Sequence, residues 1–194
     1  MKYFKKVERG NIYLSPLNSE DYEIQTKWMN DHNVTDFLSI WHQIISLEWS
    51  KQLLDNNNKN GNFAFAIIKK SEDTYIGDIV LHSIDHIHQT GMIRIKIWEI
   101  QEHGKGYGQD AINALLSYAF HMLNLYNITL WVRSFNIKAI SCYTKCWFKK
   151  IGEKHHCIYY NGAWYDNILM EMLKPDWEEK YRWKGKWNPH IKEN

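Results

Sequence analysis

Residues 103–108 read His-Gly-Lys-Gly-Tyr-Gly, and they separate two segments with different hydrophobic patterns. Before them, apolar and basic residues alternate over 93–97, which indicates a half-buried β-strand. After them, apolar residues recur every four positions from Ala111 to Leu123, so the sequence predicts a helix over Gln109–Leu123. The stretch is therefore a glycine-rich connection from a strand into a helix.

Such a connection is a candidate anion site. The first turn of a helix presents backbone N–H groups without intrahelical partners and the positive end of the helix dipole. Glycine lets the backbone approach a ligand without an intervening Cβ, and Lys105 adds a positive charge. A P-loop is excluded because no Ser or Thr follows Lys105, and the glycine spacing does not match Gly-x-Gly-x-x-Gly. The glycines alone leave open a tight turn that holds no ligand.

The other segments predict an α/β domain with a mixed sheet. Alternating runs indicate strands, polar starts followed by periodic apolar residues indicate helices, and Asn161-Gly162 is a favoured hairpin turn. Asn56–Asn62 is expected to be a polar turn. The remaining predicted elements are a strand over Asn11–Leu17, helices over Tyr22–Asn30 and from Ser46, a hairpin of Phe63–Lys70 and Tyr75–His82, a strand at Ile128–Val132, a helix over Asn136–Lys145, and a hairpin of His155–Tyr160 and Trp164–Leu173.

The composition fits one globular domain. The 194 residues are 44% hydrophobic and 15% aromatic, whereas disordered chains contain few aromatic residues. No apolar run approaches the ~18 residues of a membrane span. The net charge of +2 is too small to indicate nucleic acid, and three cysteines without a secretory signal indicate reduced thiols. We therefore expect a cytoplasmic protein with neither a membrane nor a nucleic-acid partner.

The glycine stretch resembles motif A of the GNAT superfamily of acyl-CoA N-acyltransferases, Gln/Arg-x-x-Gly-x-Gly/Ala. His103, Gly106 and Gly108 stand at its defined positions. His103 departs from the usual Gln or Arg, which affects one side-chain contact and leaves the backbone cradle intact. Downstream, residues 136–143 read Asn-Ile-Lys-Ala-Ile-Ser-Cys-Tyr and resemble the family's Asn-x-x-Ala-x-x-x-Tyr on the next helix.

Two further segments resemble one branch of that family, which contains ribosomal-protein N-acetyltransferases and spermidine N-acetyltransferases. They are the opening region with Trp28–Asp31 and Val34–Leu38, and the hairpin Tyr159–Asp166. The resemblance covers residues 11–173. It implies a GNAT-like α/β fold with a mixed, largely antiparallel twisted sheet flanked by helices. We expect a single acyltransferase domain over 1–173 and a basic aromatic C-terminal tail over 174–194.

The resemblance also implies the activity: transfer of an acetyl group from acetyl-CoA to a primary amine, by direct attack in a ternary complex and without a metal. The pantetheine would lie beside the strand end, where an N–H near Ile97 would polarise the thioester carbonyl. Tyr143 matches the general acid that protonates the departing thiolate, a role that suits a phenol with a pKa of about 10. A core aromatic is the alternative for Tyr143. The implied cofactor-binding residues are Lys96, Ile97, Trp98, His103, Gly104, Lys105, Gly106, Tyr107, Gly108, Gln109 and Asn136.

The general base has no assigned residue. Family members often use a glutamate on the strand before the loop or on the next strand, and Met92 and Trp131 stand at those positions. Glu99, Asp85 and His82 are candidates, as are a water chain and a backbone carbonyl.

Several alternatives stay open. A silent acyl-CoA-binding module would explain the missing glutamates, and an RNA-associated protein would use the basic aromatic tail. The acceptor is a small-molecule or peptide amine: a protein N-terminus, a polyamine, an amino sugar or an antibiotic. A homodimer is a further expectation. Cys142 and Cys146, with His155 and His156 beyond them, are a poor metal site because structural zinc sites rarely take two cysteines from the middle of a helix.

Overall fold

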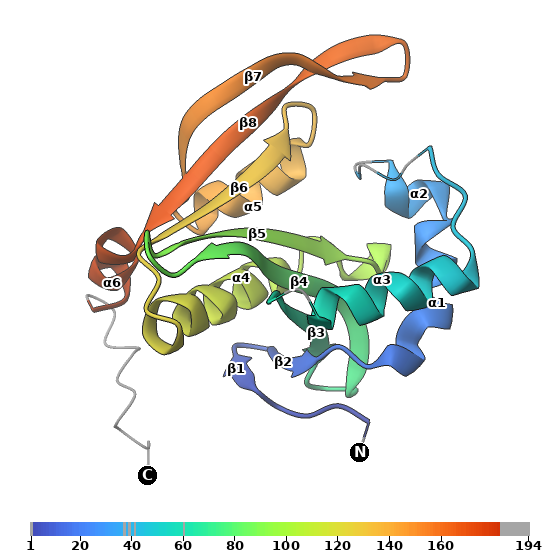
Figure 1. Cartoon of the computed structure of the whole chain (residues 1–194), viewed down its shortest axis with the longest axis horizontal. Helices are drawn as coiled ribbons and strands as arrows, with labels where there is room; N and C mark the ends of the chain where they lie inside the picture. The colour runs from blue at the N-terminus through green and yellow to red at the C-terminus, as the bar shows by residue number, and fades with distance from the viewer. Residues whose placement is uncertain (1, 37, 39, 41, 60, 183–194) are drawn as a thin grey trace.

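The computed structural model describes residues 2–36, 38, 40, 42–59 and 61–182, which form one sheet with helices on both faces (Figure 1). The strands are β1 (Val7–Arg9), β2 (Ile12–Pro16), β3 (Phe63–Lys69), β4 (Thr74–Asp85), β5 (Thr90–Ile97), β6 (Asn127–Arg133), β7 (Lys149–Tyr160) and β8 (Ala163–Leu173). The α-helices are α1 (Tyr22–Met29), α2 (His32–Thr35), α3 (Leu47–Lys59), α4 (Tyr107–Ser117), α5 (Ile137–Lys145) and α6 (Lys174–Arg182). Short 3-10 turns occur at Ser19–Asp21 and Ile100–Glu102, and α4 continues into a π turn at Tyr118–Met122.

The eight strands follow the order β1-β2-β3-β4-β5-β6-β8-β7. Neighbouring strands are antiparallel except β5 and β6, which run parallel. These two strands pair only from Thr90–Asn127 to Met92–Thr129, and they diverge beyond that point (Figure 1). The predicted mixed, largely antiparallel sheet is confirmed.

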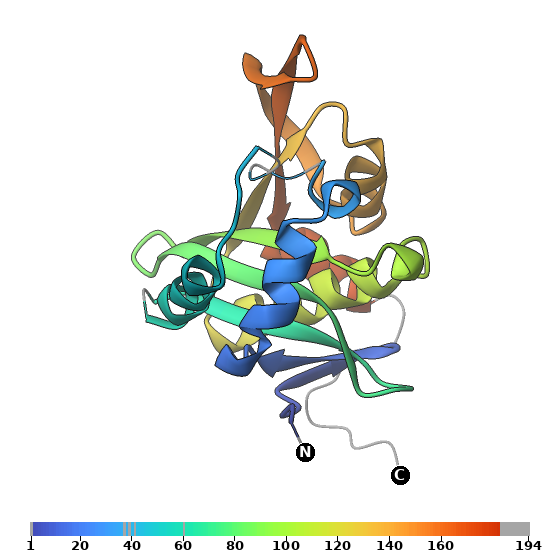
Figure 2. The ribbon, with the colours of Figure 1, turned by 90° about the vertical axis from the view of Figure 1, so that its right-hand side faces the viewer.

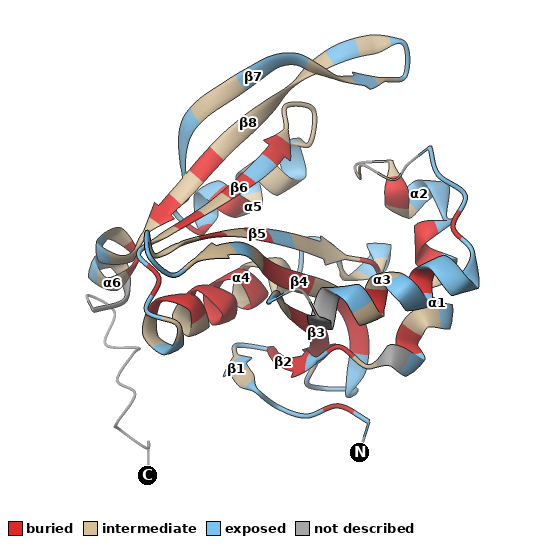
Figure 3. Cartoon of the chain, in the orientation of Figure 1, coloured by how far each residue is buried: buried red, intermediate tan, exposed pale blue. Residues whose placement is uncertain are grey.

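Each face of the sheet buries its own hydrophobic core (Figure 3). On one face, which we call the α4 face, α4 and the π turn bury Ala111 and Phe120 with 0% exposure. On the other, the α1 face, α1 and α3 bury Met29 and Leu54. Figure 2 shows α1 and α3 together on that second face. Side chains on opposite faces of β5 and β6 therefore belong to different hydrophobic cores.

β4 and β5 approach closely where Gly77 lies opposite Ile97. A Cβ on Gly77 would lie 2.2 Å from the Lys96 carbonyl oxygen, which is backbone and cannot rotate away. A register shift between Ile67 and Ile68 accompanies this approach. Glycine is therefore required here to hold β5 against β4.

Most predicted elements are present, and several differ in extent; β7, for example, begins at Lys149 rather than at the predicted His155. The polar segment Asn56–Asn62 is not wholly a turn, because α3 continues through Lys59. Lys174–Arg182 at the start of the expected tail form α6, and Trp177 is 0% exposed in the α4-face core. The tail beyond Arg182 lies outside the described residues. Among the described residues, no helix is both long and apolar enough to cross a membrane.

Candidate active site

The glycine stretch forms an open cradle at the start of α4. Gly104 and Gly106 have φ values of +77° and +89°, and a Cβ on either residue would meet nothing within 4 Å. Gly106 is the N-cap of α4 and has no side chain to cap the helix. The first N–H groups of α4 are therefore left for a ligand, and the space that side chains would fill is open to it.

Gly108 brings three elements together at this cradle. A Cβ on Gly108 would lie 3.6 Å from Cys142 Sγ on α5 and 4.0 Å from Ile97 Cγ1 on β5. The end of β5, the start of α4 and the middle of α5 therefore meet at one point. Three of the segments that the motifs assign to cofactor binding therefore lie close together.

The charged and polar side chains of the loop are held within the protein. Lys105 Nζ lies 3.0 Å from Glu102 Oε2, and Lys69 Nζ lies 3.1 Å from the other oxygen of the same carboxylate. The ion pair with Lys105 is the main cause that lowers the pKa of Glu102. His103 Nε2 lies 2.8 Å from the Ile97 carbonyl oxygen, so the ring joins the loop back to the strand. The cradle is thus mainly backbone, and the side chains brace it.

The edge of β5 beside β6 carries backbone groups without a strand partner. Trp98 N–H donates to Ile76 O on β4 at 2.8 Å. Because backbone groups alternate sides along a strand, the amides of Ile95 and Ile97 point the other way, towards β6. β6 does not pair with β5 beyond Met92. These amides are available to a ligand lying between the diverging strands.

α5 carries Asn136 and Tyr143, the two residues expected on the following helix. Asn136 is the N-cap, and its Oδ1 accepts from Ala139 N at 3.1 Å, which leaves the Nδ2 amide as a donor. Tyr143 is 7% exposed and contacts Phe148 edge-on at 6.0 Å between ring centroids. Burial raises the pKa of Tyr143. Its hydroxyl has no hydrogen-bond partner among the described residues and is not one of their fully enclosed polar atoms.

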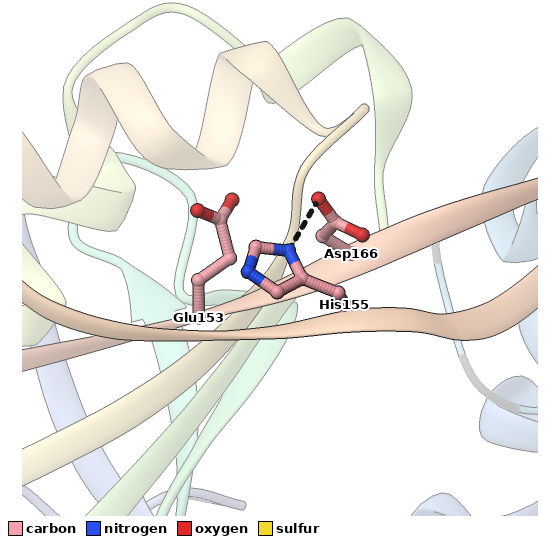
Figure 4. A group of neighbouring side chains, drawn as sticks. All are labelled: Glu153, His155 and Asp166. Atoms are coloured by element: carbon pink, nitrogen blue, oxygen red, sulfur yellow. Dashed lines mark hydrogen bonds and ion pairs between the residues drawn. The ribbon is translucent and has the colours of Figure 1, made fainter.

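The two helix cysteines face the same region. A hydrogen bond from Cys146 lowers the pKa of Cys142, and the same bond is the main cause that raises the pKa of Cys146. The structure does not bring them to His155. Instead, His155 on β7 lies with Glu153 and Asp166, its Nδ1 3.3 Å from Asp166 Oδ2 (Figure 4).

This group is the one set of metal-ligating side chains within the described ranges, and protein donors already engage it. Glu153 pairs with Lys150 at 2.7 Å, and Asp166 Oδ1 accepts from His156 N at 2.7 Å. That backbone bond is the main cause that lowers the pKa of Asp166. We read the group as a polar brace between β7 and β8.

The candidate bases differ in how the protein engages them. Asp85 accepts from Ile87 N and His88 N, each at 2.9 Å, and these bonds hold a turn. Glu99 accepts from Trp28 Nε1 at 3.0 Å. His82 lies opposite Met92 in the β4–β5 register, and burial lowers its pKa, so it is neutral near pH 7. Only His82 of the three lies directly opposite a position of the family's glutamates.

The sequence analysis missed a polar network on the α1 face. Asp78 Oδ1 accepts from Trp98 Nε1 at 2.6 Å and from Tyr75 Oη at 2.7 Å. Trp98 also stacks on Trp28, with 5.8 Å between ring centroids and an interplanar angle of 8°. Trp98 follows β5 and points to the α1 face, and its partners Asp78 and Trp28 come from β4 and α1. Contacts between such distant segments leave no local pattern in the sequence.

Comparison with known proteins identifies the family. Residues 14–169 match the model of the Acetyltransferase (GNAT) domain. The chain belongs to the GNAT acetyltransferases. It is 31% identical to the spermidine N(1)-acetyltransferase of Vibrio cholerae over 174 residues, 88% of this chain and 91% of that one. It is 24% identical to a putative ribosomal N-acetyltransferase of Bacillus subtilis over 78% of this chain and 79% of that one.

Solved structures agree with this assignment. The crystal structure of Vibrio cholerae spermidine N-acetyltransferase in complex with CoA and spermine has a TM-score of 0.76 and 25% identity, covering 86% of this chain and 98% of that one. As a GNAT acetyltransferase, the chain is an acetyl-CoA-dependent enzyme that transfers an acetyl group to an amine. The predicted family, fold and class of reaction are confirmed, and the silent-binder and RNA alternatives are not favoured.

Proposed function

We propose that this enzyme acetylates a small primary amine at the divergence of β5 and β6, with the cofactor entering from the α4 face. The observation that carries this proposal is the open, positive-φ cradle at Gly104 and Gly106, placed at the start of α4 beside the free edge of β5. The named relatives that act on spermidine support a small amine as the acceptor.

The cofactor-binding roles follow from the backbone. The N–H groups from Gly104 to Gln109 bind the pyrophosphate, and the paired Lys105 adds to the positive potential. The Asn136 amide donates to the cofactor while its oxygen caps α5. The pantetheine lies along the free edge of β5 at Ile97, between Lys96 and Trp98, whose own backbone groups face β4. An Ile97 N–H aimed between the strands stabilises the negative charge that develops on the thioester oxygen.

Acetyl-CoA supplies an activated acyl group with a thiolate leaving group. The amine nitrogen forms a bond to the carbonyl carbon as the carbon–sulfur bond breaks. Tyr143 Oη donates its proton to the departing sulfur. Because the amine is an ammonium near pH 7, it first gives one proton through a water relay to neutral His82. The proton that leaves the nitrogen as the amide forms returns through water to Tyr143. Protons and electrons balance without a metal, so we propose that the transfer needs none.

Two further expectations remain part of the proposal. Three cysteines without a disulfide between described residues are consistent with a reducing compartment, and we propose the cytoplasm. Exposed aromatic residues on the β7–β8 hairpin, Tyr159 and Trp164, support a homodimer.

Calorimetry on chelator-treated protein tests the proposed cofactor site. We expect saturable binding of acetyl-CoA, followed by CoA release when an accepted primary amine is added. Absence of binding at millimolar acetyl-CoA would contradict the cradle as the cofactor site. Binding that is restored only by adding a metal would contradict the metal-free transfer.

A further inference from the structure

Basic side chains occupy the α1 face of β5 at the divergence. In the β4–β5 register, Arg94 lies opposite Val80 and Lys96 lies opposite Asp78. Val80 belongs to the α1-face core, whereas Ile93 belongs to the α4-face core. Because cross-strand partners share a face, Arg94 and Lys96 project to the α1 face.

The facing strand carries a third basic residue on the same face. Along β6, Leu130 and Val132 belong to the α4-face core, so Trp131 and Arg133 project to the α1 face. β5 and β6 no longer pair at these positions. Lys96 and Arg133 therefore lie on opposite sides of the divergence, and both are on the α1 face.

Lys96 has an incompletely balanced charge. Its ammonium lies 4.7 Å from the Trp98 ring centroid, and no carboxylate of the described residues lies within ion-pairing distance of it. Burial is the main cause that lowers its pKa. Asp78 is the nearby carboxylate, and its Oδ1 is already engaged by Tyr75 and Trp98. A half-buried ammonium in such a position is stabilised by an added anion.

Arg133 provides a second, independent observation. Its Nη1 is fully buried and has no hydrogen-bond partner among the described residues. The guanidinium lies 5.8 Å from the Phe135 ring centroid, and Phe135 stacks on Tyr160 at 5.0 Å. A buried guanidinium nitrogen without an acceptor is costly, and its planar fork suits a carboxylate or a phosphate.

Acidic side chains also lie on or near this face, and Asp78 and Glu99 accept from protein donors. Asp36 hydrogen-bonds the Tyr160 hydroxyl, and its Oδ1 lies 3.0 Å from His32 Nδ1 without a hydrogen bond among the described residues. Glu171 accepts from Asn127 Nδ2 at 3.0 Å. The segment 37–46, which follows α2, contains no Asp or Glu in its sequence. The described charges on the α1 side of the divergence are therefore mixed, and among them Arg133 Nη1 is a buried donor without an acceptor.

The acceptor amine approaches the thioester from the α1 face, where these charged side chains lie. The cradle and α4 lie on the α4 face, so a cofactor between the strands leaves the α1 face for the amine. We propose that the acceptor carries an anionic group, a carboxylate or a phosphate, in addition to its amine, and that Arg133 holds this group while Lys96 adds to the positive potential from the other strand. The inference rests on the proposed function and narrows its substrate class. A second positive charge on the acceptor would meet repulsion from Arg133.

A length-matched series of amines tests the proposal. Butylamine, 4-aminobutanoate and 1,4-diaminobutane differ chiefly in the charge at the far end, and 3-aminopropyl phosphate separates phosphate from carboxylate. We expect kcat/KM to be at least tenfold higher for one of the anionic amines than for butylamine, and lowest for the diamine. A preference for the diamine, or equal values across the series, would overturn the inference.

Variants assign the effect to Arg133. Arg133→Gln should remove most of the preference for the anionic amine, and Arg133→Glu should shift the preference towards the diamine. Lys51→Gln makes the same charge change on the exposed surface of α3 and serves as the control. An unaltered acceptor preference in Arg133→Glu, or a rise in the KM for acetyl-CoA alone, would contradict the assignment.

A binding measurement keeps the inference separate from the proposed activity. CoA at saturation occupies the cradle, and inorganic phosphate is then added as the anion probe. We expect phosphate to raise the thermal midpoint of the unsubstituted protein and of Lys51→Gln more than that of Arg133→Gln. An equal shift in all three proteins would overturn the anion site. Failure of every amine to release CoA would contradict the proposed function, whereas this phosphate result tests the anion site alone.

Discussion

Tyr143 illustrates how far a single residue can be predicted. Its place in the motif predicted a general acid on α5, and a core aromatic was the alternative. The structure combines features of both, because the ring packs beside Phe148 in the core while the hydroxyl keeps no partner among the described residues. Burial raises the pKa, so the hydroxyl remains protonated at neutral pH, as a general acid requires.

We therefore expect Tyr143→Phe to lower kcat by about 100-fold, because a positioned general acid contributes ~10²–10⁴-fold. The ring is retained, so acetyl-CoA affinity should stay within a few-fold. Since the raised pKa keeps the hydroxyl protonated, the loss should be equally large at pH 7 and at about pH 9. Steady-state kinetics at both pH values, with cofactor binding measured separately, provide the check. An unchanged kcat with chemistry rate-limiting would exclude Tyr143 from the mechanism.

The loop side chains mark the limit of prediction at this scale. The spacing predicted a cationic Lys105 near a phosphate, but the structure pairs Lys105 with Glu102, which also binds Lys69 on β3. His103 likewise contacts the Ile97 carbonyl. Such contacts depend on how the loop folds back onto the sheet, which a linear motif does not contain.

Among the elements, the glycine loop was predicted because strand, glycines and helix occur in order along the chain. The backbone conformation of the loop was not predicted, because the position of a glycine in the sequence does not determine its φ angle. Gly106 adopts φ +89°, a region that residues with a Cβ rarely adopt. A substitution at Gly106 therefore affects both folding and binding, and an experiment must separate the two.

Two substitutions at Gly106 make this separation. Gly106→Ala adds the backbone strain, about 1–2 kcal/mol of unfolding free energy, without a charge. Gly106→Asp adds similar strain and places a carboxylate in the open cradle. We expect similar losses of thermal stability, but a much larger loss of acetyl-CoA affinity in the Asp variant. Calorimetry and thermal denaturation of both variants measure this. Equal affinities in two folded variants would place the pyrophosphate away from the cradle.

The hairpins and α5 were also predictable, because Asn161-Gly162 and the alternating runs are local signals. β1 and the π turn at Tyr118–Met122 were not. β1 has three residues and is fixed by its pairing with β2, so no periodicity can reveal it. Register, bulges and the divergence of β5 from β6 come from contacts between distant segments, and the same is true of the Lys96–Arg133 arrangement.

At the scale of the whole molecule, α6 is the last described element, and its side chains pack against the rest of the fold. Trp177 is fully buried and lies 5.7 Å from Phe120 between ring centroids. Asp176 pairs with Lys149 at 2.6 Å, and Lys180 Nζ donates to the Lys145 carbonyl at 3.1 Å. The helix thus contacts β7, α5 and the π turn together. A buried Trp177 is also unable to stack on a nucleic-acid base.

We expect Trp177→Ala to destabilise the whole domain, because removing a buried Trp costs about 3–5 kcal/mol of unfolding free energy through lost burial and a cavity. For a chain of this size that corresponds to a fall in the thermal midpoint of roughly 10 °C. Trp49→Ala is the matched control: Trp49 on α3 is 38% exposed, and its loss should cost well under half as much. The stability of Trp177→Phe should lie between these variants, since it keeps an aromatic ring beside Phe120.

The unfolding transition of Trp177→Ala should remain a single cooperative one when followed by circular dichroism and by fluorescence, because α6 shares the α4-face core. A thermal midpoint within 2 °C of the unsubstituted protein, or a separate early transition, would show that α6 is a dispensable appendage rather than part of the domain.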